Sequence, residues 1–266
     1  MPPARSLITL LTDFGDRDCF VASMKGVILS IHPDARIVDL SHHIAPHQIE
    51  EAGYVLHSCY RTFPEMTIHV CVVDPGVGSV RRPILVTTAR YHFLAPDNGL
   101  LSRVLRDERD VEIRQIENGQ YRLQSEGATF DGRDVFAPAA AWLAKGEPVS
   151  SFGSVIDDPV RHSITDPIRQ GHELVGQIEY VDRFGNLISN IAGTHLREFQ
   201  SATGQRTLRI RIGAHTIQGL VGSYCEGKDD SPSALINSCG KLEVFLDRKS
   251  AARELGLGVG AEVRVT

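Results

Sequence analysis

An apolar segment that ends in an acidic, glycine-rich turn constrains most strongly how this chain can fold. Residues 68–73 are mostly apolar and β-branched, which predicts a strand buried on both faces. Asp74-Pro75 ends this strand, because proline fixes φ and keeps the residue before it extended. Gly76 and Gly78 then allow a tight turn close to a ligand. Ligands of open α/β sheets bind beyond the carboxyl ends of the strands, so Asp74 is a candidate site residue.

The turn differs from the familiar phosphate-binding loops. It lacks the Lys-Ser/Thr pair of a P-loop, and it has Arg81 where a dinucleotide fingerprint needs a third glycine. An aspartate at the head of the turn repels a polyphosphate and suits a hydroxyl, a water molecule or a cation. The turn alone leaves a second interpretation open, in which Asp74 caps a plain β-turn and Arg81 and Arg82 are solvated.

Length and charge limit the class of partner. The chain has 266 residues, more than the usual single domain of about 100–150, so two domains are expected. It is 42% hydrophobic and 23% charged, as globular proteins are. The net charge of −5 comes from interspersed acids and bases, without a basic face. This argues against nucleic acid or an anionic membrane and favours a small molecule.

The cysteines and the hydropathy indicate a cytoplasmic protein. The five cysteines are odd in number and scattered, without a C-x-x-C pair. This pattern favours reduced thiols over a disulfide framework or a zinc site. No apolar run approaches the roughly 20 residues of a membrane span, and the first apolar run is too short for a signal peptide.

Strands and helices alternate through the first half of the chain, which predicts an α/β domain. The predicted strands are at 7–11, 35–40, 68–73, 83–88 and 92–95. The predicted helices are at 18–32, 48–60, 99–106 and 135–144. Asn118-Gly119 is a tight-turn dipeptide and predicts a hairpin between strands at 111–116 and 121–123.

The second half has a different pattern. Helical periodicity disappears from Gly176, and short strands separated by turns predict a small β-barrel or sandwich. These strands are at 177–181, 187–190, 207–212, 215–221, 234–236, 241–246 and 262–265. The composition changes after about residue 150, and we place the domain boundary between residues 168 and 169.

Acids near predicted element ends are further candidates. Asp13 follows the first strand, and Asp131 precedes the helix at 135–144. Asp131 either caps that helix or faces the same crevice as Asp13 and Asp74. His42, His43 and His47 lie together after the second strand, but their spacing lacks a carboxylate or cysteine to complete a metal site. We therefore favour hydrogen-bonded or solvated imidazoles over a metal centre.

In the second half, candidate residues lie in turns. Asp182-Arg183-Phe184-Gly185-Asn186 lies between two predicted strands and is either a hairpin loop or part of a site. Tyr224 and Asn237-Ser238 lie near strand ends and offer a phenol, an amide and a hydroxyl.

Seven motifs occur in order along nearly the whole chain. They are Thr12-Asp13-Phe14-Gly15, Met24-Lys25-Gly26, Val73-Asp74-Pro75-Gly76-Val77-Gly78 with Arg81-Arg82, Pro96-Asp97-Asn98-Gly99, Gly132-Arg133-Asp134, Phe184-Gly185-Asn186 and Asn237-Ser238. Together they resemble the S-adenosyl-L-methionine (SAM) hydrolases, also called SAM hydroxide adenosyltransferases. That family is related to the SAM-dependent fluorinase and chlorinase.

The resemblance implies a fold and an activity. The fold is α/β, with an N-terminal α/β/α sandwich domain at residues 1–168 and a C-terminal β-barrel domain at residues 169–266. The activity is hydrolysis of SAM to adenosine and L-methionine by in-line attack of water or hydroxide at the ribose C5′. SAM is the substrate, and no cofactor or metal is expected. The resemblance also implies a homotrimer whose sites lie between one subunit's N-terminal domain and a neighbour's C-terminal domain.

The resemblance also assigns roles to single residues. Asp74 and Arg81 match two members of the family's Asp-Arg-His catalytic triad, and Asp131 replaces the histidine. The other residues that it implies are substrate-binding: Asp13 for the ribose hydroxyls, Phe184 and Asn186 for adenine or the methionine amine, Asp182, Ser238 and Tyr224 for the amino-acid end, and Glu243 near the adenosine.

Two alternatives follow from the same motifs. A halide-using adenosyltransferase would carry Tyr and Thr where this chain has Asp74 and Val77, so these residues favour water as the nucleophile. A SAM- or adenosine-binding protein with slow or no turnover is suggested by Asp131, because two nearby carboxylates perturb each other's pKa.

Overall fold

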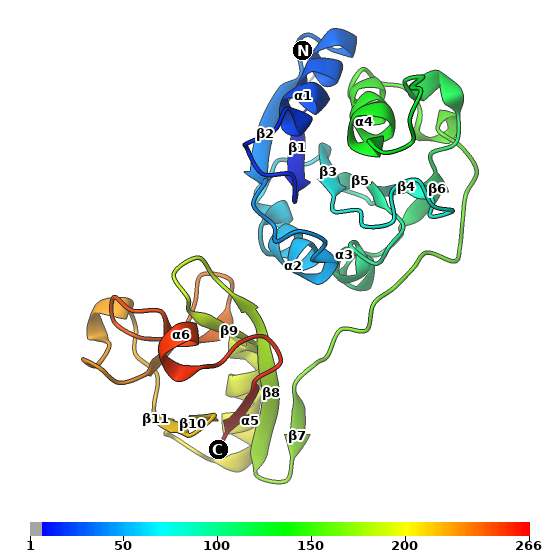
Figure 1. The fold of residues 1–266 in the computed structure, drawn as a ribbon. Helices are drawn as coiled ribbons and strands as arrows, with labels where there is room; N and C mark the ends of the chain where they lie inside the picture. The colour runs from blue at the N-terminus through cyan, green and yellow to red at the C-terminus, as the bar shows by residue number, and fades with distance from the viewer. Residues whose placement is uncertain (1–6) are drawn as a thin grey trace. The chain divides into compact units, whose positions relative to one another are not determined.

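The chain divides after Ile164 into two units, and each unit has a hydrophobic core of its own. A computed structural model describes residues 7–266 (Figure 1). The second unit begins at Thr165, so the expected boundary between residues 168 and 169 falls inside its first strand, β7 (Ile168–Gln170).

The described part of the first unit contains a six-stranded sheet in the order β2-β1-β3-β5-β4-β6. Its strands are β1 (Leu7–Thr12), β2 (Arg36–Ser41), β3 (Thr67–Val72), β4 (Pro83–Thr87), β5 (Tyr91–Pro96) and β6 (Glu112–Gln115). β2, β1, β3 and β5 are parallel, whereas β4 runs antiparallel to both of its neighbours. All six residues of β3 are buried, as its apolar sequence predicts.

The chain order reverses at β1, because β2 pairs with one edge of β1 and β3 pairs with the other. Such a switch point opens a crevice at the carboxyl ends of the two central strands. Asp13 follows β1, and the turn headed by Asp74 follows β3. The topology therefore directs two of the candidate acids to the same edge of the sheet.

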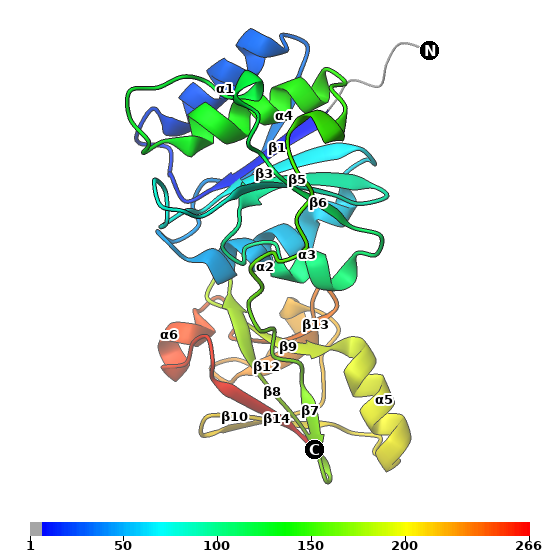
Figure 2. The same ribbon diagram turned by 90° about the vertical axis from the view of Figure 1, so that its right-hand side faces the viewer.

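Helices cover both faces of this sheet (Figure 2). α1 (Phe20–Ile31) and α4 (Ala137–Ala144) pack on one face, and α2 (Ile49–Cys59) and α3 (Ser102–Asp107) pack on the other. The predicted N-terminal α/β/α sandwich is confirmed.

The predicted hairpin around Asn118-Gly119 is wrong. β6 pairs with β4, and residues 119–121 form a 3₁₀ turn. The Asn118 side chain caps this turn by accepting a hydrogen bond from the backbone of Gln120 (3.0 Å), and it donates another to the carbonyl of Ser151 (2.8 Å). Asn118 therefore ends the strand segment instead of turning it back.

The second unit is a nearly closed antiparallel β-barrel, as predicted. Its strands are β7 (Ile168–Gln170), β8 (Glu173–Val181), β9 (Leu187–Ala192), β10 (Arg209–Ile212), β11 (His215–Gln218), β12 (Ser233–Ile236), β13 (Lys241–Phe245) and β14 (Glu262–Val265). They follow the order β11-β10-β14-β8-β9-β13-β12, with β7 beside β8. A backbone hydrogen bond from Val221 to Ala234 (2.9 Å) joins the end of the β11 segment to β12 and narrows the remaining seam.

Two helices interrupt the barrel and correct the expectation that helical structure ends at Gly176. α5 (Gly193–Thr203) buries Leu196 and Phe199 and ends at Gly204, which has the left-handed conformation typical of a helix end. α6 (Ala251–Leu255) is one short turn capped by the Ser250 hydroxyl. α5 is polar along most of its length, and α6 has only five residues, so neither has the apolar content of the helices in the first unit.

Five shorter helical turns complete the described secondary structure: 3₁₀ turns at Tyr60–Thr62, Gly119–Tyr121, Val149–Ser151 and Tyr224–Glu226, and a π-helical turn at Gly132–Phe136. Within residues 7–266, every helix is too short or too polar to span a lipid bilayer.

Candidate active site

Two carboxylates share one guanidinium at the carboxyl edge of the first unit's sheet. Arg81 Nε donates to Asp74 Oδ1 over 3.0 Å, and its Nη2 donates to both Asp74 Oδ2 and Asp131 Oδ2. The Asp74 and Arg81 side chains are only 5% and 10% exposed. Burial alone would lower the pKa of Arg81, but its hydrogen bonds to Asp74 and then Asp131 raise it. The guanidinium is therefore a fixed cation between two acids.

The turn after β3 holds Asp74 in this position. The Asn98 side chain donates to the carbonyl of Val73 (2.9 Å), which fixes the strand end directly before Asp74. Gly78 has φ +79°, and a Cβ there would lie 2.9 Å from the carbonyl oxygen of Ala128. Glycine is required at this position both by its conformation and by the close backbone approach.

A widened helical turn brings Asp131 to Arg81. Residues 132–136 form a π-helical turn ahead of α4. Pro138 has no N–H to donate to the carbonyl of Asp134, and this carbonyl accepts instead from the backbone of Leu123 (2.8 Å). π-helical turns often occur at functional sites. This one orients Asp131 toward a partner fifty residues away in sequence.

An aromatic cavity of about 130 Å³ adjoins the two carboxylates. Its walls include the rings of Phe14, Phe20 and Phe130, whose centroids are 5.1–5.8 Å apart. Asp74 and Asp131 line the same cavity. The apolar walls limit competing solvent beside charged groups that can bind a polar reactant.

Asp13 lies in the loop after β1 and does not contact Arg81. Its Oδ2 accepts a hydrogen bond from the backbone N–H of His47 (2.9 Å). Its Oδ1 makes no hydrogen bond within the described part of the chain, so this atom can accept one from a ligand. Asp13, Asp74 and Asp131 all belong to the first unit.

Arg82 differs from Arg81 and has a structural role. It pairs with Asp97 (2.6 Å) and Asp158 (2.7 Å) and thereby ties the segment after residue 157 to the end of β5. Only one of the two adjacent arginines therefore belongs to the candidate site.

In the second unit, Asp182 organises the turn between β8 and β9. Its Oδ1 accepts from the backbone of Phe184 (2.9 Å) and Asn186 (2.8 Å), and its Oδ2 accepts from the Asn186 side chain (3.0 Å). Phe184 is 77% exposed, an unusual position for a phenyl ring. The turn therefore presents an aromatic face, while Asp182 is largely committed to the turn itself.

Glu243 is the centre of a second polar cluster in this unit. Its buried carboxylate accepts from the Tyr224 hydroxyl (2.7 Å) and from the Asn237 side chain (3.0 Å). Burial, and then this bond to Glu243, raise the pKa of Tyr224. Ser238 is exposed in the turn after β12, beside this cluster in sequence. Both Glu243 oxygens are occupied, so Glu243 orients Tyr224 and Asn237.

A cavity of about 760 Å³ brings several of these residues together. Asp182, Phe184, Asn186 and Tyr224 line it, but Glu243 and Ser238 do not. The segment from Leu246 to Ser250 completes one wall and was not identified from the sequence. Its residues have no motif character, and only the tertiary fold places them at the cavity.

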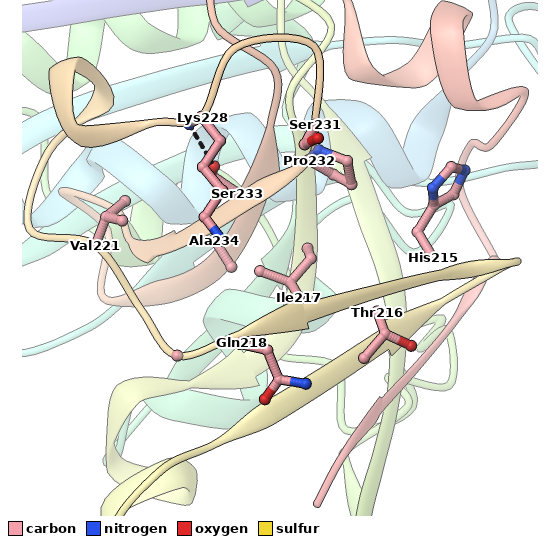
Figure 3. Close-up of a pocket in the computed structure, with 11 residues that line it drawn as sticks. His215, Thr216, Ile217, Gln218, Val221, Lys228, Ser231, Pro232, Ser233 and Ala234 are labelled. Carbon is pink, nitrogen blue, oxygen red and sulfur yellow. Dashed lines mark hydrogen bonds between the residues drawn. The ribbon is translucent and has the colours of Figure 1, made fainter.

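A third pocket, of about 290 Å³, lies at the seam of the barrel between β11 and β12 (Figure 3). His215 and Ile217 lie on one edge and Pro232 and Ser233 on the other. Its lining contains none of the predicted site residues and no carboxylate. It is therefore not the candidate site.

The three histidines after β2 are loop residues. His42 Nδ1 bonds to the Thr12 hydroxyl (2.8 Å), and His43 is exposed, 3.8 Å from Asp16. Within residues 7–266, no group of three or more His, Cys, Asp or Glu side chains is arranged to hold a metal ion.

Sequence reasoning missed part of the aromatic wall. Phe14 and Phe130 lie inside or beside recognised motifs but were not assigned a site role, and Phe20 begins α1. Phe20 is 41% exposed although it is a large apolar side chain. Only the packing of the three rings on one another shows that they enclose a cavity.

An α/β/α sandwich with candidate acids at the carboxyl edge of its sheet, followed by an antiparallel barrel, places the chain among the two-domain proteins of the α/β class. Residues 8–153 match the model of the SAM hydroxide adenosyltransferase N-terminal domain, and residues 176–264 match that of the C-terminal domain. The chain belongs to the SAM hydroxide adenosyltransferase family.

Individual relatives agree with this assignment. The chain is 33% identical to an (R)-S-adenosyl-L-methionine hydrolase from Thermus thermophilus, over 97% of this chain and 98% of the relative. It is 35% identical to the protein of that name from Methanocaldococcus jannaschii, over 92% and 90%. A fluorinase from Nocardia brasiliensis is 28% identical over 98% and 97%. A crystal structure of a conserved protein from Thermotoga maritima superimposes with a TM-score of 0.89 at 30% identity, covering 97% of this chain and 99% of that one.

Proposed function

We propose that this protein hydrolyses (R)-S-adenosyl-L-methionine to adenosine and L-methionine. The observation that carries the proposal is the carboxylate pair on Arg81 beside an aromatic cavity, in a chain whose relatives include named hydrolases of this substrate. In the reaction, the oxygen of water bonds to the ribose C5′ while the C5′–S bond breaks. The electron pair of that bond returns to sulfur, and the water releases one proton.

The leaving group determines what the enzyme must supply. A sulfonium leaves as a neutral thioether, so the leaving group needs no proton and the reaction needs no cofactor. The protein has to hold one water molecule in line with the C5′–S bond and keep other solvent away. The phenyl rings that line the cavity beside Asp74 and Asp131 are suited to keeping other solvent away.

We assign Asp74, Arg81 and Asp131 to holding the water molecule in line with the C5′–S bond. Two carboxylates and one guanidinium have a formal net charge of −2 + 1 = −1, which attracts a sulfonium cation. Asp131 Oδ1 makes no hydrogen bond within the described residues and is the acceptor that we propose for the water. Asp74, fixed at both oxygens by Arg81, adds a preorganised negative charge that stabilises the sulfonium cation of the substrate beside the water.

The substrate contacts that we propose come from both units. Asp13 accepts hydrogen bonds from the ribose hydroxyls through its unoccupied oxygen. Phe184 and Asn186 contact adenine or the methionine amine, and Tyr224 and Ser238 bind the amino-acid end. Asp182 and Glu243 support these contacts through the hydrogen bonds that hold Asn186 and Tyr224.

We also propose a cytoplasmic homotrimer in which each site is shared between neighbouring subunits, as the family resemblance implies. The odd number and scatter of the five cysteines support a reducing compartment. Sedimentation analysis tests the assembly, because a trimer has a mass of 3 × 29.2 = 87.6 kDa.

One assay separates hydrolysis from the two alternatives. We expect purified protein with (R)-SAM to release adenosine and methionine, and the (S)-epimer to react more slowly. Asp74→Asn should lower kcat by about 10²–10³-fold, because a preorganised charge at the reacting atoms is lost. Asp131→His should retain turnover, because imidazole also accepts a hydrogen bond from water.

The products of the alternatives are different. Bound SAM that stays intact for hours would indicate a binding protein. A 5′-halogenated nucleoside formed in chloride or fluoride would indicate a halide-using transferase. The Asp74 carboxylate, which replaces the tyrosine of halogenases, repels a halide anion and favours hydrolysis.

A further inference from the structure

The loop after β2 is fastened to the loop after β1 by three hydrogen bonds. The Thr12 hydroxyl and His42 Nδ1 are 2.8 Å apart. The backbone N–H of Gly15 donates to the carbonyl of His42 (2.7 Å), and that of His47 donates to Asp13 Oδ2 (2.9 Å). Two of these three bonds involve His42, and together they surround Asp13.

The other partner of Thr12 assigns the direction of its bond to His42. The Thr12 oxygen already accepts from the backbone of Phe14 (3.2 Å), so its hydrogen is available to donate to His42 Nδ1. His42 Nε2 lies 3.0 Å from Asp39 Oδ1, which can only accept. This second contact is an ion-pair distance and not a well-formed hydrogen bond, because His42 Nε2 is buried without a hydrogen-bond partner in the described part of the chain.

Asp39 anchors the outer end of this arrangement. Lys25 Nζ lies 2.6 Å from the other Asp39 oxygen. Burial alone would raise the pKa of Asp39, but the hydrogen bond from Lys25 and the nearby His42 ring lower it. Lys25 belongs to the Met24-Lys25-Gly26 motif, for which the proposed chemistry has no direct use. A relay of four side chains, Lys25–Asp39–His42–Thr12, thus ends at the residue before Asp13.

The inner end of the relay is enclosed by protein. Thr12 is fully buried, and the His42 side chain is 11% exposed. A buried hydroxyl without a partner is costly, so the bond between the Thr12 hydroxyl and His42 Nδ1 holds the Asp13 loop in one geometry. We propose that His42 is a positioning residue that acts through Thr12 to aim Asp13 at the ribose diol. This inference rests on the proposed function, which assigns Asp13 to the ribose hydroxyls.

Binding of two nucleosides to the full-length protein tests the proposal. Adenosine has the diol, and 2′,3′-dideoxyadenosine lacks it. We expect His42→Ala to weaken adenosine binding by about tenfold in calorimetry, since a buried partner is lost, and to leave dideoxyadenosine binding unchanged. The double variant with Asp13→Asn should bind adenosine no more weakly than Asp13→Asn alone, because both changes remove the same contact.

Matched variants separate positioning from damage to the fold. His43→Ala changes an adjacent imidazole that is 65% exposed and should bind both nucleosides like the wild type. Thr12→Val should reproduce the effect of His42→Ala, whereas Thr12→Ser retains the hydroxyl and should restore binding. Because dideoxyadenosine binding reports on a folded pocket, a variant that fails to fold loses both ligands and is recognised.

The outcomes also distinguish this inference from the proposed function. The wild type could leave SAM intact while the His42→Ala and Asp13→Asn changes still weaken adenosine binding non-additively. In that case the hydrolase proposal is wrong and the positioning role stands. If His42→Ala weakens both nucleosides equally, or adds independently to Asp13→Asn, the positioning role is wrong. It is also wrong if the wild type binds neither nucleoside or does not distinguish them.

Discussion

Single residues in this chain often act through a neighbour. Glu243 uses both oxygens to hold Tyr224 and Asn237, and Asp182 uses both to hold its own turn. The family motifs identify such acids but do not separate those that touch a ligand from those that orient another side chain. In this chain, Asp13 and Asp131 each have a carboxylate oxygen without a partner in the described part of the chain, and these two acids can bind directly.

A buried histidine makes the stability of the chain depend on pH. His69 lies in β3, bonds to the Thr9 hydroxyl (2.7 Å) and stacks on Phe93 with ring centroids 5.1 Å apart. Burial lowers its pKa to about 3. In the unfolded chain the same ring takes up a proton near pH 6.5. Its contribution to stability is therefore complete above about pH 6.5 and is lost as the pH falls from there toward 3.

We expect the free energy of unfolding to fall less steeply between pH 7 and pH 5 in His69→Gln than in the wild type. The difference should be about 2 kcal/mol, since one proton bound only by the unfolded chain contributes about 1.4 kcal/mol per pH unit. Urea unfolding at the two pH values measures it. Equal slopes in the two proteins would show that His69 does not titrate on unfolding.

At the scale of elements, the turn between β8 and β9 depends on its contact with α6. Gly185 has φ +84°, and a Cβ there would lie 2.0 Å from the Ser250 hydroxyl oxygen. That hydroxyl caps α6, and the carbonyl of Gly185 accepts from the backbone of Ala252 (2.8 Å). The turn that presents Phe184 and the helix are therefore one packed unit.

We expect Gly185→Ala to lower the free energy of unfolding by about 1–3 kcal/mol, because it adds left-handed strain and displaces the cap of α6. Adenosine binding should weaken in the same variant. Gly258→Ala is the control, because φ is not positive there and no atom lies within 4 Å of the added Cβ. Urea unfolding and calorimetry give the two quantities, and equal midpoints for both variants would contradict the packing argument.

Elements with strong local patterns could be predicted from the sequence, and those set by distant partners could not. β3 was identified by its run of mostly apolar, β-branched residues, and α1 by apolar residues at three- and four-residue steps. β6 pairs with β4, and no pattern within residues 111–123 indicates this partner. α5 has two buried large side chains, Leu196 and Phe199, on a mostly polar helix.

The same limit applies to the site. The turn at Asp74 was found because its residue types are unusual together. The pairing of Asp131 with Arg81 depends on a π-helical turn. In that turn, the backbone carbonyl of Asp134 accepts its hydrogen bond from Leu123, which belongs to another segment. Local sequence preferences do not contain this information.

At the scale of the whole molecule, the residues proposed to act on one substrate belong to two separately packed units. The first unit's cores and the barrel core share no residue. If each site is shared between subunits of a trimer, variants damaged in different units can complement each other.

We expect Asp74→Asn and Asn186→Ala to be nearly inactive separately and to recover activity when they are coexpressed. A site is intact when its first unit comes from the Asn186→Ala chain and its barrel comes from the Asp74→Asn chain. Random assembly produces this combination in about one site in four. Turnover of the whole coexpressed population should therefore reach about a quarter of the wild-type value, and that of purified mixed trimers about a third, because one of their three sites is intact. Mixing the two variants after purification, without subunit exchange, is the control. No recovery on coexpression would show that each site is built from a single chain.

The imino acid at position 138 has a consequence for redesign of this family member. The rotation from one residue to the next differs between an α-helix and a π-helical turn. If residues 132–144 formed a regular α-helix, the Asp131 side chain would therefore point in another direction. Transplanting the acid at 131 into a related scaffold is therefore not sufficient by itself. The graft has to include the proline ring at 138 and the segment around Leu123, whose N–H donates to the carbonyl that the proline leaves unpaired.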